Sequence, residues 1–205
     1  MSPIVTELMQ LFYLNFVWIG MVPVTSLLLM IQDRRAEFRA ATSGVILCFY
    51  LGYVLYLVFP AAPPRLALAG LFAHPLGVDG GTFSGMAGRM FTVLPPESRG
   101  AFPSLHAAVS LLVAVYAWRY LRAWFFVIAP FVAALWISTI YLRRRYVIDL
   151  VAGWLLAPIA LVLAPRLDVW WARHQVHYGY EPAWGAALER PRETPAPPPS
   201  VTSGS

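Results

Sequence analysis

The sequence predicts an all-α integral membrane protein, built as a bundle of about five transmembrane helices. Hydrophobic residues make up 59% of the 205 residues, charged residues make up 12%, and the mean hydropathy is +0.63. A soluble domain of this size carries about 25% charged residues. In addition, apolar segments of about 20 residues, the length that crosses a hydrocarbon core as a helix, recur along the chain.

The five apolar segments are separated by charged or proline-rich turns. They cover residues 8–31, 40–59, 104–121, 123–142 and 147–165. The first segment ends at the charged turn "QDRRAEFR", and the second ends at "PAAPPR". Because the first segment lacks a basic start and is too long for the apolar part of a signal peptide, it predicts a spanning helix.

The sequence divides into three parts. Residues 1–165 form the predicted transmembrane domain, and residues 166–189 form an amphipathic juxtamembrane segment that begins with "RLDVWWARHQ". Residues 190–205 are rich in proline and are expected to be disordered. Within the domain, the connection 60–103 holds the glycine- and proline-rich stretches "VDGGTFSG" and "LPPESRG", which predict a lid or a substrate-selecting loop. Its residues 66–71 predict a short interfacial helix.

The charge of the chain limits the classes of molecule that it is expected to bind. All 15 basic residues are arginine, and the net charge is +5, which suits anionic membrane lipids or a phosphorylated substrate. We expect no nucleic-acid partner for a membrane protein of this composition. We also predict no metal site and no cofactor, because no group of His, Cys and Asp residues has ligand spacing. The single cysteine, Cys48, cannot form an internal disulfide.

Successive helices alternate in direction, which places the loops on two faces. The connection 60–103 and the corner "LRRRYVID" fall on the same face. Arginines are almost evenly divided between the two faces, so the positive-inside rule discriminates weakly. If the arginines near "LRRRYVID" are kept for a site, the opposite face is cytoplasmic. We therefore expect a protein of a bacterial-type plasma membrane, with its site facing outward.

Two polar stretches on that face have the chemistry of an anion site. In "FPAAPPRL", prolines end the preceding helix and hold Arg65 in a stiff, non-helical segment. In "AFPSLHAAVS", Pro103 suits the first turn of a helix, and the amides from Ser104 to His106 then form a natural anion site. His106 can exchange a proton near neutral pH. An interfacial anchor and an ordinary helix cap remain open as alternatives.

The third polar stretch is "STIYLRRRYVIDLVAGW". Guanidinium groups match phosphate oxygens, so Arg143 and Arg144 are candidate phosphate ligands. Asp149 falls in the first turn of the last helix, where the helix dipole favours an acid. If this helix begins one turn earlier, Arg145 and Asp149 can pair at i and i+4. A stop-transfer arginine cluster with a snorkelling ion pair is the alternative interpretation.

Together, "PAAPPR", "FPSLHAA" and "STIYLRRRYVIDLVAG" resemble the three signature motifs of the type 2 phosphatidic acid phosphatase (PAP2) superfamily. The resemblance is nearest to its inositolphosphotransferase-like branch, which is related to inositol phosphorylceramide synthases, and it covers about residues 8–165. It implies a membrane lipid-phosphate phosphatase or phosphotransferase. It also implies a six-helix core, of which this chain lacks one N-terminal helix.

The resemblance assigns a role to each matching residue. It implies that Arg65 and Ser104 bind phosphate, that His106 protonates the leaving group and that Asp149 orients the nucleophile. The family's nucleophile is a histidine four residues before that aspartate, and this chain has Arg145 there. Arginine stays protonated in proteins and has no lone pair with which to attack phosphorus.

Four hypotheses remain open from the sequence. The chain is an active enzyme on a lipid phosphate or another phosphate ester, or an inactive membrane protein that still binds phosphate or lipid. It is a helix bundle without a site, or it carries a substitution at position 145 relative to an active parent. The sequence indicates neither the substrate or acceptor nor the oligomeric state.

Overall fold

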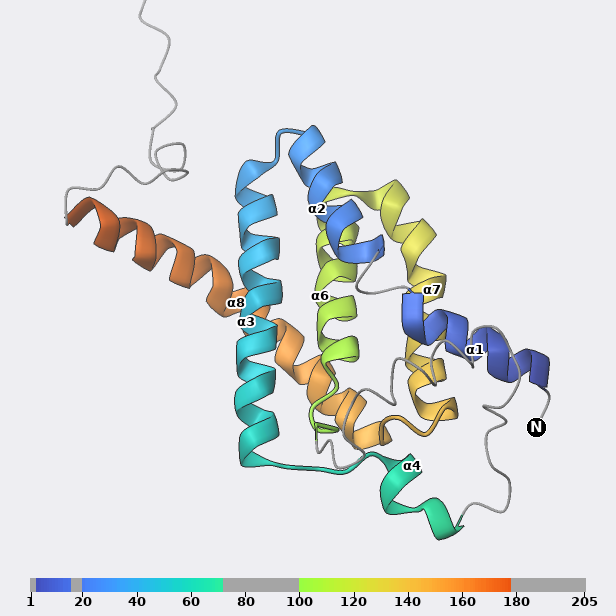
Figure 1. Ribbon diagram of the computed structural model, residues 1–205. Coiled ribbons are helices and arrows are strands. Elements are labelled where there is room, and N and C mark those ends of the chain that lie inside the picture. Colours follow the sequence, from blue (N-terminus) through green and yellow to red (C-terminus); the bar gives the residue numbers. More distant parts are fainter. Residues whose placement is uncertain (1–2, 16–19, 72–99, 178–205) are drawn as a thin grey trace, which may run out of the picture. The chain divides into compact units, whose positions relative to one another are not determined.

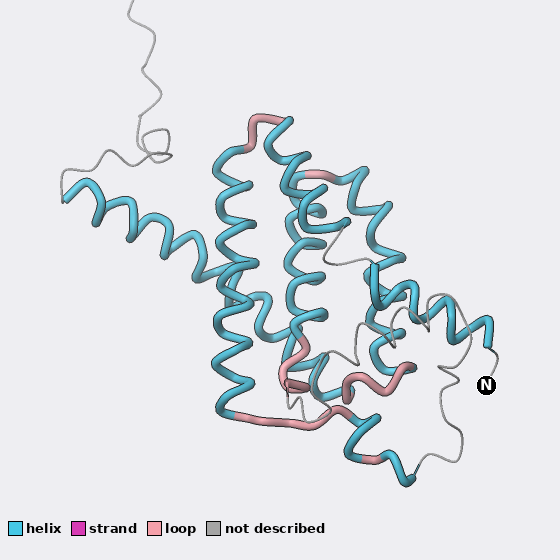
Figure 2. The backbone as a smooth tube through the Cα atoms, viewed as in Figure 1, coloured by secondary structure: helices cyan, strands magenta, loops and turns pink. Residues whose placement is uncertain are grey.

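A computed structural model describes residues 3–15, 20–71 and 100–177 of the chain. The described part is helical, which confirms the predicted all-α architecture (Figures 1 and 2). Its helices are α1 (Pro3–Asn15), α2 (Val22–Ile31), α3 (Arg35–Val58), α4 (Pro64–Ala67), the 3-10 turn η2 (Ala69–Leu71), α6 (Leu105–Tyr120), α7 (Arg122–Tyr141) and α8 (Val147–His177).

Three helices are long and apolar enough to cross a membrane. By length and composition these spans are Arg35–Val58, Arg122–Tyr141 and Val147–His174. The described residues also form three shorter apolar helices, which are Ile4–Tyr13, Val22–Ile31 and Leu105–Tyr120. This pattern supports an integral membrane protein.

The expectation of one continuous helix over residues 8–31 is wrong. The structure forms α1 and α2 instead, with residues 16–19 outside the described part. At 1.5 Å per residue, helices of 13 and 10 residues are about 20 and 15 Å long, whereas a hydrocarbon core is about 30 Å thick. The two helices also have different neighbours, because α1 packs against α7 while α2 packs against α3 and α6.

The last helix is longer than the sequence predicts. We expected it to end near Pro165, but α8 continues to His177 with Pro158 and Pro165 inside it. Proline is tolerated inside apolar helices when the freed backbone groups are satisfied locally. The chain divides into two units, Met1–Arg166 and Leu167–Ser205, and the candidate site lies within the first. The predicted lid sequences before Gly100 and the proline-rich tail lie outside the described residues.

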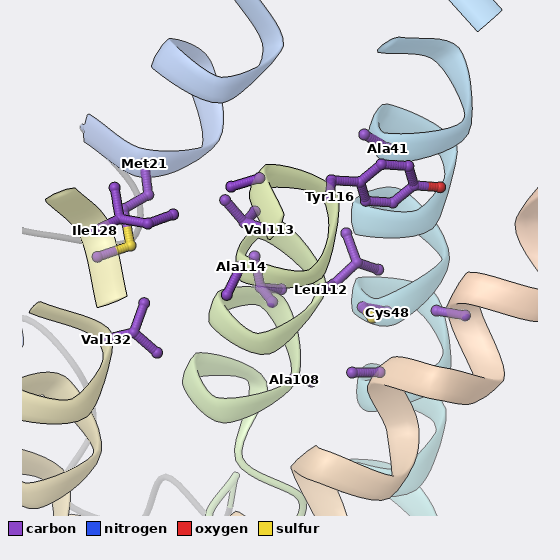
Figure 3. Packing of buried hydrophobic residues seen from close by; sticks show 14 of the residues in the cluster. Met21, Ala41, Cys48, Ala108, Leu112, Val113, Ala114, Tyr116, Ile128 and Val132 are labelled. Atoms are coloured by element: carbon purple, nitrogen blue, oxygen red, sulfur yellow. The ribbon is translucent and has the colours of Figure 1, made fainter. Parts of the chain in front are cut away.

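Helix α6 lies at the centre of the first unit. It packs between α3 and α7, and Figure 3 shows its Leu112 and Val113 between Cys48 of α3 and Val132 of α7. Its buried residues point in every direction around the helix axis rather than along one stripe, as expected for a helix surrounded by others. Alanines at several of these positions let the neighbouring helices approach closely.

Gly153 brings the start of α8 against the start of α6. A Cβ atom at this position would lie 2.4 Å from the carbonyl oxygen of Ser104 and 3.0 Å from Cβ of Ala107. The first of these distances is far inside van der Waals contact, and the backbone of Ser104 cannot rotate away as a side chain can. Only glycine therefore permits this approach of the two helices.

We expect Gly153→Ala to lower the free energy of unfolding by about 1–3 kcal/mol, because the added methyl group forces α8 away from α6. Gly44→Ala is the matched control, since its Cβ would meet the end of the flexible Leu112 side chain at 3.0 Å. Thermal unfolding in detergent micelles measures both. If the two variants melt alike, the close approach at Gly153 does not limit stability.

Candidate functional site

Backbone hydrogen bonds join the three polar stretches at one end of the first unit. The amide of Arg65 donates to the carbonyl of Arg143 at 3.0 Å, and the amide of Ser104 donates to the carbonyl of Asp149 at 2.9 Å. A third bond of 3.0 Å runs from the Ala101 amide to the Ala61 carbonyl. In Figure 1 the end of α3, helix α4 and the starts of α6 and α8 meet at this end.

The α2–α3 and α6–α7 corners lie at the opposite end (Figure 1). The guanidinium carbon of Arg34 sits 5.3 Å from the centre of the Tyr120 ring, which ties the two corners together. The helices therefore alternate in direction, and the stretches that carry Arg65, Ser104 and Asp149 share one face, as the sequence predicts.

Ser104 is fully buried and caps α6. Its Oγ accepts a hydrogen bond of 3.4 Å from the Ala107 amide, as N-cap serines do. We expected its own N–H to be available to an anion, and this is wrong, because that N–H goes to the Asp149 carbonyl. The hydroxyl of Ser104 thus caps α6 while its amide joins the start of α6 to α8, and any contact with phosphate comes in addition to these roles.

The arginine triplet forms a tight corner between α7 and α8. Arg143 has a positive φ of 54°, and the amides of Arg144 and Arg145 both donate to the Thr139 carbonyl, at 3.0 and 3.3 Å. The side chain of Arg145 reaches away from α8, and its Nη1 donates to the carbonyls of Gly100 and Ala101. Arg145 therefore binds the segment that precedes α6 to this corner.

Asp149 is almost fully buried and does not pair with Arg145 as we expected. The proposed i, i+4 pair required a helix that begins a turn earlier, but α8 begins at Val147, and no ion pair joins the two side chains in the described part of the chain. Asp149 Oδ2 instead accepts a hydrogen bond of 2.7 Å from the Tyr146 amide. This is the half of a capping box in which an N3 side chain returns to the N-cap amide.

Tyr13 of α1 also belongs to this cluster, and sequence reasoning missed it. Its ring stacks on the imidazole of His106, with centres 5.0 Å apart and planes 20° apart. The guanidinium carbon of Arg144 lies 5.0 Å from the centre of the same ring. Tyr13 sits in an apolar run without a motif, so the sequence carries no signal for these contacts.

The guanidinium groups of the cluster crowd one another. Burial lowers the pKa of Arg144 to about 10, and the charges of Arg65 and Arg145 contribute to that decrease. Arg144 is still cationic at neutral pH. The charges of Arg144 and Arg145 also reach the buried ring of His106. Like charges held together out of water repel each other, so this region favours an anion.

An open, largely apolar cleft of about 480 Å³ adjoins the cluster. It runs from the end of α3 to the start of α8, and Asp149 is its one acidic lining residue. The other lining residues are Val58, Phe59, Pro60, Ala61, Phe102, Tyr146 and Ile148. Among the described residues, no three His, Cys, Asp or Glu side chains gather as they would around a metal ion.

Comparison with known proteins identifies the family. The PAP2 superfamily matches residues 1–163. The chain belongs to the PAP2 superfamily. It is 32% identical over 120 residues to the inositol phosphorylceramide synthase of Candida albicans, which covers 52% of this chain and 25% of that protein. It is 29% identical over 155 residues to the phosphoinositol dihydroceramide synthase of Bacteroides thetaiotaomicron, which covers 70% of this chain and 50% of that protein.

Another relative is a PA-phosphatase related-family protein of Dictyostelium discoideum, 25% identical over 168 residues, with 72% of this chain and 30% of that protein covered. The PAP2 chain thus spans half or less of the length of these relatives. No solved structure matches it.

We expect Asp149→Ala to reduce the free energy of unfolding of this PAP2 protein by about 1 kcal/mol, because the Tyr146 amide loses its acceptor. Asp149→Asn is the matched control, since an amide oxygen of the same reach can still accept that hydrogen bond. Thermal unfolding in detergent compares the two. Equal losses of unfolding free energy in both variants would show that the negative charge of Asp149, and not its hydrogen bond from Tyr146, stabilises the protein.

Proposed function

We propose that this chain is a PAP2-type phosphatase or phosphotransferase for a lipid phosphate, with its site at the extracytoplasmic face and Arg145 at the nucleophile position. One observation carries the proposal. Backbone hydrogen bonds bring the stretches of Arg65, Ser104 and Asp149 to one end of the bundle. At this end the ring of Tyr13 contacts both the imidazole of His106 and the guanidinium group of Arg144. These contacts support a phosphate site at that end.

The phosphate group is proposed to bind among the guanidinium groups of Arg65, Arg143 and Arg144. Planar guanidinium forks match phosphate oxygens, and such charge-assisted hydrogen bonds are about twice as strong as neutral ones. The mutual repulsion of these half-buried cations is relieved when a dianion enters. A phosphate ester is therefore a better ligand than a neutral lipid head group.

His106 is proposed as the acid that protonates the leaving oxygen. It lies in the first turn of α6, beside the phosphate-binding arginines, and its ring is held by Tyr13. Asp149 lines the apolar cleft, and its carboxylate is held by the hydrogen bond from the Tyr146 amide. In the family's reaction this aspartate orients the histidine nucleophile. Here Asp149 has no such histidine to orient, because Arg145 occupies its position.

The residue at position 145 decides whether the chain turns over substrate. We expect Arg145→His to raise phosphate release roughly a hundredfold or more, because it restores the family's histidine nucleophile at position 145. Phosphate release from phosphatidic acid, prenyl phosphates and inositol phosphates in detergent micelles measures this. Arg145→Gln, which removes the cation without adding a nucleophile, is the control and should gain nothing. Equal activity of the unaltered chain and Arg145→His would show that residue 145 is not at the nucleophile position.

A second candidate function is phosphate or lipid binding without turnover. The hydrogen bonds of Arg145 to Gly100 and Ala101 favour it, because they give the arginine a structural role where a nucleophile would stand. On this candidate the chain binds vanadate but releases no phosphate. Arg65→Gln should then weaken vanadate binding about tenfold or more. Arg35→Gln, at the opposite end, should leave it unchanged.

The outward orientation rests on discounting the arginines of the site from the positive-inside count. We expect a cysteine placed at Leu66 to react with a membrane-impermeant thiol reagent in intact cells, and one placed at Arg35 to react only after lysis. A Cys48→Ala background removes the native thiol, which is buried. The reverse labelling pattern would place the site on the cytoplasmic side.

A further inference from the structure

Helix α1 carries a buried polar face that the phosphate site does not account for. Its residues Thr6, Gln10 and Tyr13 are 2%, 3% and 7% exposed, although the helix is otherwise largely apolar. Spacings of four and three residues place all three on one side of a helix. A buried polar face on an apolar helix indicates that this side meets polar partners.

Both ends of this face contact the corner that carries the arginines. Thr6 Oγ1 lies 3.3 Å from the hydroxyl of Tyr141, the last residue of α7, and Tyr13 contacts Arg144 and His106. α1 also packs against α7, which it crosses (Figure 1). Gln10 lies between Thr6 and Tyr13 on the same side of α1.

The amide oxygen of Gln10 is buried and has no hydrogen-bond partner among the residues that the structure describes. Buried polar atoms in proteins are almost always hydrogen-bonded, and an exception calls for a ligand or water. The atom is an acceptor, so its partner must donate a proton. A phosphate dianion cannot donate, but a hydroxyl group on the rest of the ligand can.

We propose that Gln10 is a specificity-determining residue that accepts a hydrogen bond from a hydroxyl group on the alcohol part of the bound phosphate ester. The proposal rests on the phosphate site described above and names the ligand class for it, a phosphate ester with free hydroxyl groups. Tyr13 joins the two parts of the site, since its ring touches Arg144 and His106 while Gln10 stands one turn away. α1 thus lines the part of the site that binds the alcohol group of the ligand.

The test compares two soluble ligands of equal charge and carbon number, glycerol 3-phosphate and n-propyl phosphate, which differ by two hydroxyl groups. Their affinities for the full chain in nanodiscs are measured by calorimetry. We expect the unaltered chain to bind glycerol 3-phosphate about tenfold more tightly. Gln10→Met, similar in shape but unable to accept from a hydroxyl, should bind both ligands with the affinity of n-propyl phosphate.

Arg65→Gln separates this inference from the phosphate site itself, because it should weaken both ligands by the same factor. Equal affinities in the unaltered chain, or a preference that survives in Gln10→Met, overturn the role of Gln10 and leave the phosphate site standing. Failure of both ligands to bind overturns both proposals. If Gln10→Met does not fold, Gln10→Leu replaces it, and the ligand comparison on the unaltered chain remains decisive.

Discussion

The hydrogen bond from the Ser104 amide to the Asp149 carbonyl is the contact on which the rest of the site depends. It fixes the start of α6 against the start of α8, and the missing side chain of Gly153 makes this approach possible. With the two helix starts in register, the corner before α8 stands beside α6. The bond from Arg65 to Arg143 then adds α4 to the same place. Nearly all of this is backbone geometry, to which the Arg145 side chain adds its hydrogen bonds to the carbonyls of Gly100 and Ala101.

The three motif stretches and their common face follow from the sequence, because successive helices that cross a membrane must alternate in direction whatever the length of their connection. The division of residues 8–31 into α1 and α2 does not follow, since hydropathy measures how apolar a segment is and not whether it stays straight. Continuation of α8 past Pro165 was missed for a related reason. Proline stops helices in water, but within an apolar helix its lost hydrogen bond can be satisfied locally.

The side-chain partners were harder to predict than the elements. The pairing of Arg145 with Asp149 assumed that opposite charges four residues apart meet, but the helix begins too late, and each side chain binds backbone groups nearby. Carbonyls and amides at helix ends compete well with ion pairs because they must be satisfied when buried. Tyr13 and Gln10 lie far from every motif in the sequence. Only tertiary packing of α1 brings Tyr13 to Arg144 and buries Gln10, and no local pattern encodes that packing.

The order of the stretches along the chain has a consequence for biogenesis. Tyr13 leaves the ribosome first, the Ser104 stretch follows after α3, and Asp149 emerges only when α7 is complete. The amide of Ser104 therefore has no carbonyl partner in the nascent chain until the last helix inserts. A chain arrested before α8 contains Arg65 and Ser104, but the Ser104 amide still lacks the Asp149 carbonyl to which it donates. The backbone bond that joins α6 to α8 thus forms only after α8 has been inserted.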